Sequence, residues 1–508
     1  MNPSTHEKED APQRIWGRFS KKQTASIFGL LILIYALTAF ERLGGPSEHL
    51  HYIDLASSFL KGRLDTDTPR KSCRKGKRPK DDGSGLQDFV CGHTRKDDGS
   101  WEGWNDWATY RSITLKDGTE LKGVWPYGDT KGSDKNLFRT FSGDFYIVDA
   151  KKDLKKGCNP KRKRASCNEK KHFISFPPAP AVIMMPFVAV FNYRLNDVLW
   201  TLVFAAAGIL ALLALLERAS SADWNARTKE ENLWLIALFA FGTSFYFSSV
   251  RGEVWFTALV MGFFFNTLYL YFAVDSKKPY LAGLMLAIAM ATRPPTAFGC
   301  VFFGLQLLRI PNRREQIIKG LQFSAPILCV GGLLMLYNFM RFESLTEFGH
   351  TFLQDGQRAS IREHGLFSPW FLKGNLAAAF GNLPRITTDA PFVQVSRHGI
   401  SIFAATPALI LLLSTLKRKE TSSSGVYRLW FVLIPLICVA TPALFYQNTG
   451  WAQYSYRFSV DYLPYLALLL SCSSLVQGRA FKTLVVISIL ISLFGAITFG
   501  RFEQFYFG

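Results

Sequence analysis

The apolar run TASIFGLLILIYALTAF (residues 24–40) is followed closely by the polar stretch SEHLHYIDLASSFLKGR (residues 47–63). A helix needs about 20 mostly apolar residues to cross a hydrocarbon core of roughly 30 Å, so the first run predicts a transmembrane helix. Four titratable residues stand where that helix would leave the bilayer: Glu48, His49, His51 and Asp54. Titratable groups in such a place are costly unless they are paired or solvated, and they therefore indicate a functional site.

Apolar runs recur to the end of the chain, in which 48% of the residues are hydrophobic. They predict an all-α polytopic membrane protein with about eleven transmembrane helices. The expected helices cover residues 24–40, 197–217, 233–250, 254–274, 279–295, 296–310, 320–342, 399–416, 426–446, 458–476 and 481–500. No small-residue cleavage site follows the first run, so we expect that helix to be retained. The run 179–191 is short and contains Pro180 and Pro186, which favours an interfacial or re-entrant segment.

The charges of the loops set the expected orientation. If residues 179–191 do not cross, most basic loops fall on the side of the N-terminus, which the positive-inside rule makes cytoplasmic. If residues 179–191 do cross, most of these loops lie outside. The first alternative divides the chain into a cytoplasmic N-terminus (1–23), the first helix (24–40), an extracytoplasmic loop (41–178), a helical module (179–342), a second extracytoplasmic loop (343–398) and C-terminal helices (399–508).

The loop 41–178 is too long to be a bare connector. Polar and apolar residues alternate over 109–149 around the turn Asp117–Gly118, so we expect a small β-rich insert. Four cysteines of this loop predict two disulfides in an oxidising compartment, with pairs 73–91 and 158–167 as one of three possible pairings of Cys73, Cys91, Cys158 and Cys167. A zinc site is the alternative, but no C-x-x-C pair is present. The other cysteines lie in apolar runs and are expected in the core: Cys300, Cys329, Cys438 and Cys472.

The formal net charge of the chain is +20. Part of the excess flanks the expected helices, and the rest lies in residues 71–80 and 151–171. No zinc-finger spacing, RNP-type aromatic motif or basic helix accompanies these runs, so nucleic acid is not an expected partner. They suit anionic membrane lipids, a phosphorylated carrier or an acidic polymer, or they are simply solvated.

Charged residues also gather in turns expected on the outer face: Arg251, Glu253, Arg293, His350, Arg457 and Asp461. Each alone is explained by snorkelling or local pairing. Together, the arginines suit a phosphate or pyrophosphate, which guanidinium groups bind bidentately. Tyr454 and Tyr456 are nearby in the sequence and suit either interfacial anchoring or stacking against a sugar ring. No P-loop, G-x-S-x-G or H-E-x-x-H motif offers a different chemistry.

The order of these features resembles the GT-C superfamily of membrane glycosyltransferases, particularly the protein O-mannosyltransferases and the lipid A aminoarabinose transferases. The segment EHLHYIDLA (48–56) is similar to the acidic motif of that family, and FISFPPAPAVIMMPF (173–187) is similar to its Pro-Pro segment. The resemblance implies Glu48 as the catalytic base, with His49 where a second carboxylate is usual and Asp54 as the alternative carboxylate. It also implies a basic residue that holds the lipid phosphate, for which the candidates are Lys171, His172, Arg251 and Arg293.

The implied activity is the inverting transfer of a sugar from a polyprenyl-phosphate donor to a glycan, lipid or protein acceptor. We expect it on the extracytoplasmic face of a membrane, the inner membrane in a bacterium. One base and cations for the departing phosphate suffice, with Arg457 as a further cation, so no cofactor is expected. A divalent metal is the alternative, on Glu48, Asp54 and Asp461.

Two other functions stay open. The chain could be a transporter or flippase of a lipid-linked or anionic substrate, which predicts charged or broken helices near the bilayer midplane. The expected helices 197–217 and 320–342 lack internal charges, which counts against this function. It could also be a non-catalytic assembly protein whose insert binds an envelope polymer.

Overall fold

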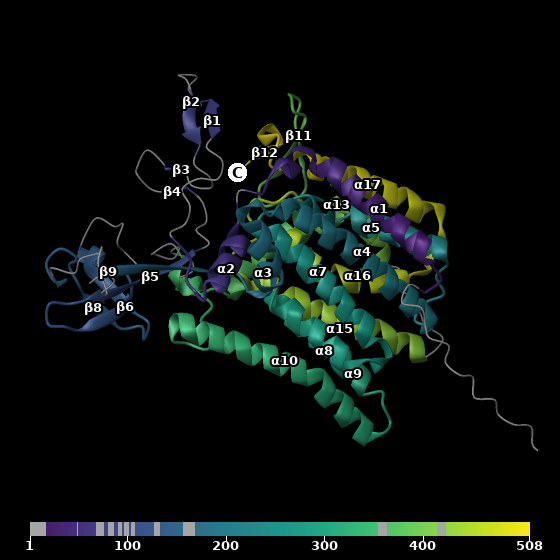
Figure 1. The fold of residues 1–508 in the computed structure, drawn as a ribbon. Helices are drawn as coiled ribbons and strands as arrows, with labels where there is room; N and C mark the ends of the chain where they lie inside the picture. The colour runs from purple at the N-terminus through teal and green to yellow at the C-terminus, as the bar shows by residue number, and fades with distance from the viewer. Residues whose placement is uncertain are drawn as a thin grey trace, which may run out of the picture.

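The computed structural model is mostly helical, with a small β-sheet beside one end of the helices (Figure 1). It describes residues 17–47, 49–67, 76–79, 86–89, 94–95, 101–102, 107–125, 133–155, 168–353, 363–413 and 423–507. The predicted base and the cysteines of both predicted disulfides lie outside the described residues: Glu48, Cys73, Cys91, Cys158 and Cys167.

Five helices in the described part of the chain are long and apolar enough to cross a membrane. They are α1 (Lys21–Ala39), α4 (Asp197–Ser221), α7 (Val254–Ala273), α10 (Arg313–Phe342) and α17 (Arg479–Thr498). Ser20, Asn196 and Asn312 begin three of them, because their side chains accept hydrogen bonds from amides of the first turn. The helices are consistent with a membrane protein, as the apolar runs predicted.

Most of the other predicted spans form shorter or interrupted helices, and the count of eleven is not confirmed. These helices are α5 (Lys229–Phe241), α6 (Ser244–Ser249), α8 (Pro279–Met290), α9 (Cys300–Leu307), α13 (Ile402–Ala405), α15 (Ser423–Phe445) and α16 (Leu463–Ser471), with the short α12 (Leu372–Leu376) in the second predicted loop. Thr243 caps α6 after a break at Gly242, while Pro294 and Pro407 begin 3₁₀ turns before α9 and after α13. An average of hydropathy along the chain does not detect such breaks, so the apolar pattern predicted each interrupted segment as one continuous helix.

Two short helices pack together next to the first span. Helix α2 (His51–Leu60) follows the exit of α1, and α3 (Ala179–Phe191) follows Pro177–Pro178. Their contact buries Ile53, Leu55, Ala181 and Met184. The predicted interfacial or re-entrant segment is therefore a helix that forms despite Pro186, with Val182 and Val190 exposed on its other side.

The predicted β-rich insert is present as a five-stranded antiparallel sheet of order β8-β7-β6-β5-β9. Its strands are β5 (Trp107–Thr114), β6 (Glu120–Val124), β7 (Leu137–Thr140), β8 (Phe145–Ile147) and β9 (Asn168–Ile174). Gly118 has a φ of 92° in the turn between β5 and β6, which confirms the predicted hairpin. The shorter strands are β1 (Gly76–Pro79), β2 (Leu86–Phe89), β3 (Thr94–Arg95), β4 (Trp101–Glu102), β10 (Arg385–Ile386), β11 (Val393–Ser396) and β12 (Tyr506–Phe507).

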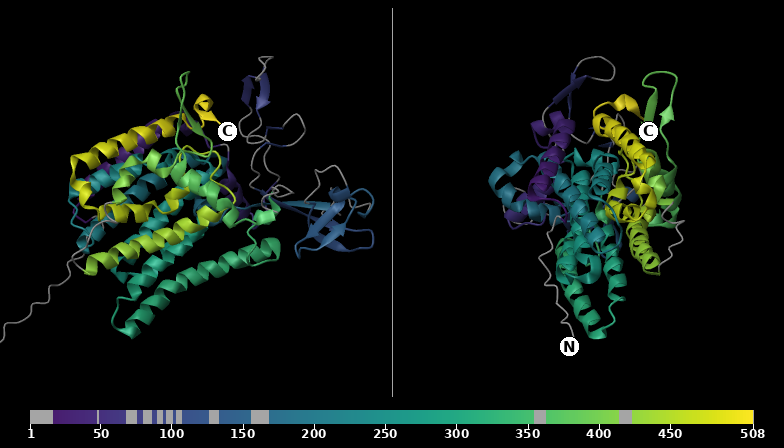
Figure 2. Two further views of the ribbon diagram at one scale, coloured as in Figure 1. Left: turned by 180° about the vertical axis from the view of Figure 1, so that it is seen from behind. Right: turned by 90° about the vertical axis from the view of Figure 1, so that its right-hand side faces the viewer.

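The sheet is anchored to the end of α10 (Figure 2). Arg341 donates to the carbonyl of Ile174 at the end of β9 (3.0 Å), and Phe342 packs 5.4 Å from the ring of Phe173. Lys122 of β6 forms an ion pair with Glu343 just beyond α10. These contacts hold the insert at the helix ends that also carry the candidate site.

Basic residues at the opposite end of the helices form long-range contacts. Arg18 pairs with Glu217 at 2.8 Å, and Lys482 pairs with Glu230 at 2.6 Å. They bring the start of α1, the end of α4 and the start of α17 to one end of the bundle. The positive-inside rule had predicted that the basic segments near the N-terminus, after α4 and before α17 lie on the same side of the membrane.

The expectation for the membrane cysteines was wrong in part. Cys300 and Cys329 are exposed, and Cys438 and Cys472 are only partly buried. An apolar run shows that a helix is surrounded by apolar material, but it does not distinguish a protein core from the outer surface of a helix.

Candidate functional site

The exit of α1 is held against the start of α4. Ser47 donates its backbone N–H to Oδ1 of Asp197 (2.7 Å) and its hydroxyl to Oδ2 (2.6 Å). Asp197 is only 4% exposed. Glu48 lies outside the described residues, but Ser47 and His49 show where the chain passes on either side of it.

His49 lies beside the turn between α6 and α7. Its ring centroid is 4.6 Å from that of Trp255, and its charge is among the influences that lower the pKa of Glu253. A cavity of about 10 Å³, roughly the space of one water, lies between His49, Tyr52, Asp197 and Gly252. The exit segment and the turn at Arg251 therefore meet, as the charged residues at both places had suggested.

Arg251 and Glu253 form an ion pair within this turn. Arg251 Nε lies 3.0 and 2.9 Å from the two carboxylate oxygens, and Nη1 donates to the carbonyl of Phe499 (3.0 Å). Burial opposes the ionisation of Glu253, but the adjacent guanidinium outweighs it and lowers the pKa of this carboxyl to about 2. The pair is therefore charged at neutral pH.

Arg293 and Asp461 form a second pair, in which the carboxylate is more deeply buried. Nε and Nη2 of Arg293 donate to the two oxygens of Asp461 at 3.0 and 2.7 Å, and Asp461 is 1% exposed. The hydroxyl of Tyr456 is buried nearby with no hydrogen-bond partner in the described structure. Arg293 also lies close enough to Tyr52 of α2 to influence its ionisation. This pair thus lies between α2 and the start of α16.

Two phenylalanine rings connect the three predicted arginines. The ring of Phe256 lies 5.1 Å from the guanidinium carbon of Arg251 and 5.5 Å from that of Arg457. The ring of Phe458 lies 5.7 Å from both Arg457 and Arg293. We call Arg251, Arg457 and Arg293 with these two rings the arginine chain. Contacts at these distances are within the range of cation–π attraction.

Other predicted site residues lie elsewhere in the described structure. Lys171 is on β9, opposite Tyr110 of β5. His350 packs on the ring of Phe348 at 4.7 Å, next to the sheet. The Tyr454 hydroxyl donates to the carbonyl of Ile491 inside the helical bundle (2.7 Å). Asp54 is partly buried in the first turn of α2, near the exit segment.

The sequence pattern missed four polar residues that build this end of the bundle. Arg42 donates to the carbonyl of Phe499 (2.6 Å), and Arg501 donates to that of Ala39 (2.7 Å). Asn196 and Asp197 hold the exit segment of α1. Arg42 lies two residues after the first apolar run and could have been counted with Glu48. The other three stand at or near helix ends, where polar residues are ordinary.

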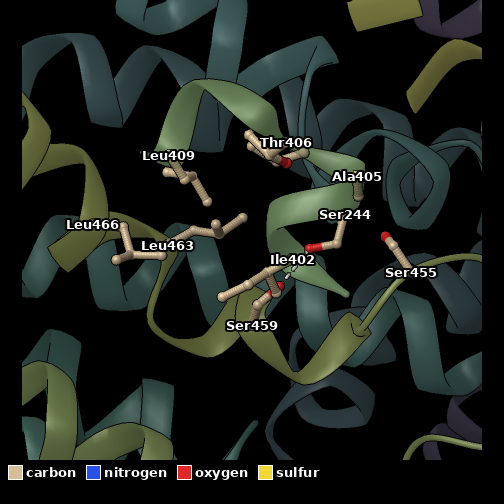
Figure 3. A pocket seen from close by; sticks show the side chains of 10 residues that line it. Ser244, Ile402, Ala405, Thr406, Leu409, Ser455, Ser459, Leu463 and Leu466 are labelled. Atoms are coloured by element: carbon tan, nitrogen blue, oxygen red, sulfur yellow. Dashed lines mark hydrogen bonds between the residues drawn. The ribbon is translucent and has the colours of Figure 1, made fainter. Parts of the chain in front are cut away.

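A second small cavity lies inside the bundle where three interrupted helices meet (Figure 3). Ser244, Thr406 and Ser459 line it together with leucine and isoleucine side chains, and Ser244 and Ser459 share a hydrogen bond of 2.7 Å. Its volume of about 10 Å³ accommodates roughly one water and no sugar. Broken helices are what a transporter would show, but this cavity is too small for such a substrate.

The fold and the site together define a helical protein with five potential membrane-spanning helices and an arginine-rich cluster at the helix ends near the sheet. Among the described residues, no group of three or more histidine, cysteine, aspartate or glutamate side chains is placed to hold a metal ion. No family model, no curated protein and no solved structure matches the chain. The function is therefore argued from the site alone.

Proposed function

We propose that the chain is a membrane glycosyltransferase of the GT-C type, which transfers a sugar from a polyprenyl-phosphate donor to a glycan, lipid or protein acceptor. The observation that supports this most is the arginine chain, which lies near His49 in the segment that follows α1. In this proposal the arginines bind the lipid phosphate, and Glu48 is the base.

The proposed reaction needs a group that takes a proton from the acceptor and a group that stabilises the negative charge of the departing phosphate. As the acceptor oxygen attacks the anomeric carbon, Glu48 takes the proton of the acceptor hydroxyl, and the bond from the sugar to the phosphate oxygen breaks with inversion. The departing polyprenyl phosphate gains one negative charge, which fixed guanidinium groups stabilise. The proposal needs no metal for either step.

The carboxylates that pair with the arginines are compatible with this role. Asp461 engages Nε and Nη2 of Arg293, which leaves Nη1 on the other edge of the guanidinium for a phosphate oxygen. A buried partner also fixes the orientation of the guanidinium plane before the substrate arrives. Glu253 likewise fixes the guanidinium plane of Arg251, whose Nη1 donates to the carbonyl of Phe499.

The proposal also includes the finer topology. Eleven spans, some of them interrupted, would cross a bacterial inner membrane with the arginine chain and the sheet on the extracytoplasmic side. The basic ends near Arg18 and Lys482 would then be cytoplasmic, as the positive-inside rule expects.

Replacement of Glu48 by Gln tests the proposal. Membranes with each variant are incubated with radiolabelled polyprenyl-phosphate hexoses and pentoses, and label in glycan, lipid and protein fractions is counted. Loss of a general base lowers such rates by about 10²- to 10⁴-fold. The matched control is Glu120→Gln on the exposed edge of the hairpin, which should keep the full rate.

A wild-type rate for Glu48→Gln would remove Glu48 from the mechanism. Flux of the same labelled donors across proteoliposomes, unchanged by that substitution, would favour a flippase instead. Loss of cellular function on removal of the insert, with no transfer by any variant, would favour an assembly protein.

A further inference from the structure

We propose that Asn196 and Asp197, at the start of α4, form a clamp that positions the segment carrying Glu48. In this role Asp197 is a positioning residue and does not contact the substrate. The consequence for the reaction rate depends on the proposed function, whereas the clamp itself is a property of the fold.

The clamp holds the exit of α1 at two points. The side-chain N–H of Asn196 donates to the carbonyl of Leu43 (2.9 Å). Both oxygens of Asp197 accept from Ser47, one from the backbone N–H at 2.7 Å and the other from the hydroxyl at 2.6 Å. The residue that follows Ser47 is Glu48. Asn196 and Asp197 therefore hold the chain at Leu43 and at Ser47, the residue directly before Glu48.

Asp197 accepts two hydrogen bonds from the exit segment, and a different residue caps α4. The first turn of α4 is capped by Asn196, whose Oδ1 accepts from the N–H of Leu199 (3.0 Å). A nearly buried carboxylate is costly to keep unless its oxygens are satisfied, and here Ser47 satisfies both. Asn196 thus caps α4, while Asp197 holds the exit segment.

The clamp also sets the distance from the exit segment to the arginine chain. Gly252, between Arg251 and Glu253, lies so close to α4 that a Cβ there would meet the backbone N of Val198 at 2.6 Å and Oδ1 of Asp197 at 2.8 Å. Contacts this short exclude any side chain without a shift of the turn. Asp197 therefore touches both the segment that carries the proposed base and the turn that carries Arg251.

Three variants of the full chain in nanodiscs test the clamp: Asp197→Asn, Ser47→Ala and Ser47→Thr. The first readout is hydrogen exchange of the amides of Ser47 and Leu199. We expect at least a tenfold faster exchange at Ser47 in Asp197→Asn, because an asparagine side chain has only one oxygen to accept the two hydrogen bonds. We expect unchanged exchange at Leu199, because Asn196 still caps the helix. An equal rise in exchange at both amides would show that Asp197 only stabilises the start of α4. Unchanged exchange at Ser47 would show that Asp197 does not hold the exit segment.

The second readout is sugar transfer from labelled polyprenyl-phosphate donors. A misplaced base lowers kcat and leaves donor binding intact, so we expect kcat to fall by about 10- to 100-fold in Asp197→Asn and Ser47→Ala with KM within about twofold. The double variant Asp197→Asn/Ser47→Ala should have a kcat no lower than that of either single variant. Ser47→Thr, which keeps the hydroxyl, should retain the wild-type rate. An unchanged kcat together with a loosened Ser47 would overturn the positioning role. If Glu48→Gln keeps its full rate while Ser47 loosens as expected, the clamp stands and the assignment of the base fails.

Discussion

The buried pair of Arg293 and Asp461 offers a sharp test of the fold at the arginine chain. Replacing Asp461 by Asn keeps the shape of the side chain but removes its charge, so that Arg293, 18% exposed, loses the counterion that accepts two of its hydrogen bonds. Breaking a buried pair on one side costs about 3–5 kcal/mol, because the remaining charge is left without compensation. We therefore expect a large loss of stability.

The chain contains a matched control. Arg397 and Glu503 form a pair of similar length, 3.0 Å, but their side chains are 43% and 68% exposed. An exposed pair contributes about 0–1 kcal/mol, so Glu503→Gln should be nearly neutral. Unfolding in detergent, followed by tryptophan fluorescence, compares the two. Equal midpoints for Asp461→Asn and Glu503→Gln would refute the argument, since they would show that Arg293 is solvated or finds another partner.

Two further predictions concern single positions. Glu253 has a pKa of about 2, below its ordinary 4.5, so it contributes about 3 kcal/mol to the free energy of unfolding above pH 4.5, and this contribution is lost as the pH falls towards 2. The unfolding midpoints of wild type and Glu253→Gln should therefore differ at pH 7 and converge at low pH. A difference that stays constant with pH would contradict this prediction. A Cβ at Gly495 would meet the ring of Tyr454 at 2.0 Å, whereas one at Gly332 meets nothing within 4 Å. Gly495→Ala should therefore lower the unfolding midpoint and Gly332→Ala should not, and equal midpoints would show that the tyrosine moves aside.

Local patterns in the sequence predicted local structure well. The hairpin at Gly118 was predictable because both the alternation and the turn residue lie within one short segment. The breaks in the apolar runs also have local causes, such as Thr243 and Pro407, but an average over about 20 residues hides them. The interrupted spans were therefore predicted as continuous helices, whereas α4 and α10 are longer than the predicted runs.

The candidate site was predictable only as a set of residue types. Arg293 and Asp461 were both selected because charge is unusual between apolar runs, yet they are 168 residues apart and nothing in the sequence pairs them. The rings of Phe256 and Phe458 are two among 44 phenylalanines, so their place between arginines could not be inferred. Asp197 was read as the first residue of a span, because the partner that explains it lies at the exit of another helix.

In the proposed function, the arginine chain is the part of the molecule that binds an anion. Neighbouring guanidinium groups of the chain share an aromatic ring within cation–π distance. Their mutual repulsion grows where water is excluded, because the effective dielectric constant falls. Glu253 and Asp461 offset part of this repulsion. A phosphate that enters between the arginines offsets more of it, and it does so most strongly when it carries its largest charge, after the sugar has left. Cations arranged in this way would bind the departing phosphate more tightly than the intact donor, which is the condition for lowering the barrier to transfer.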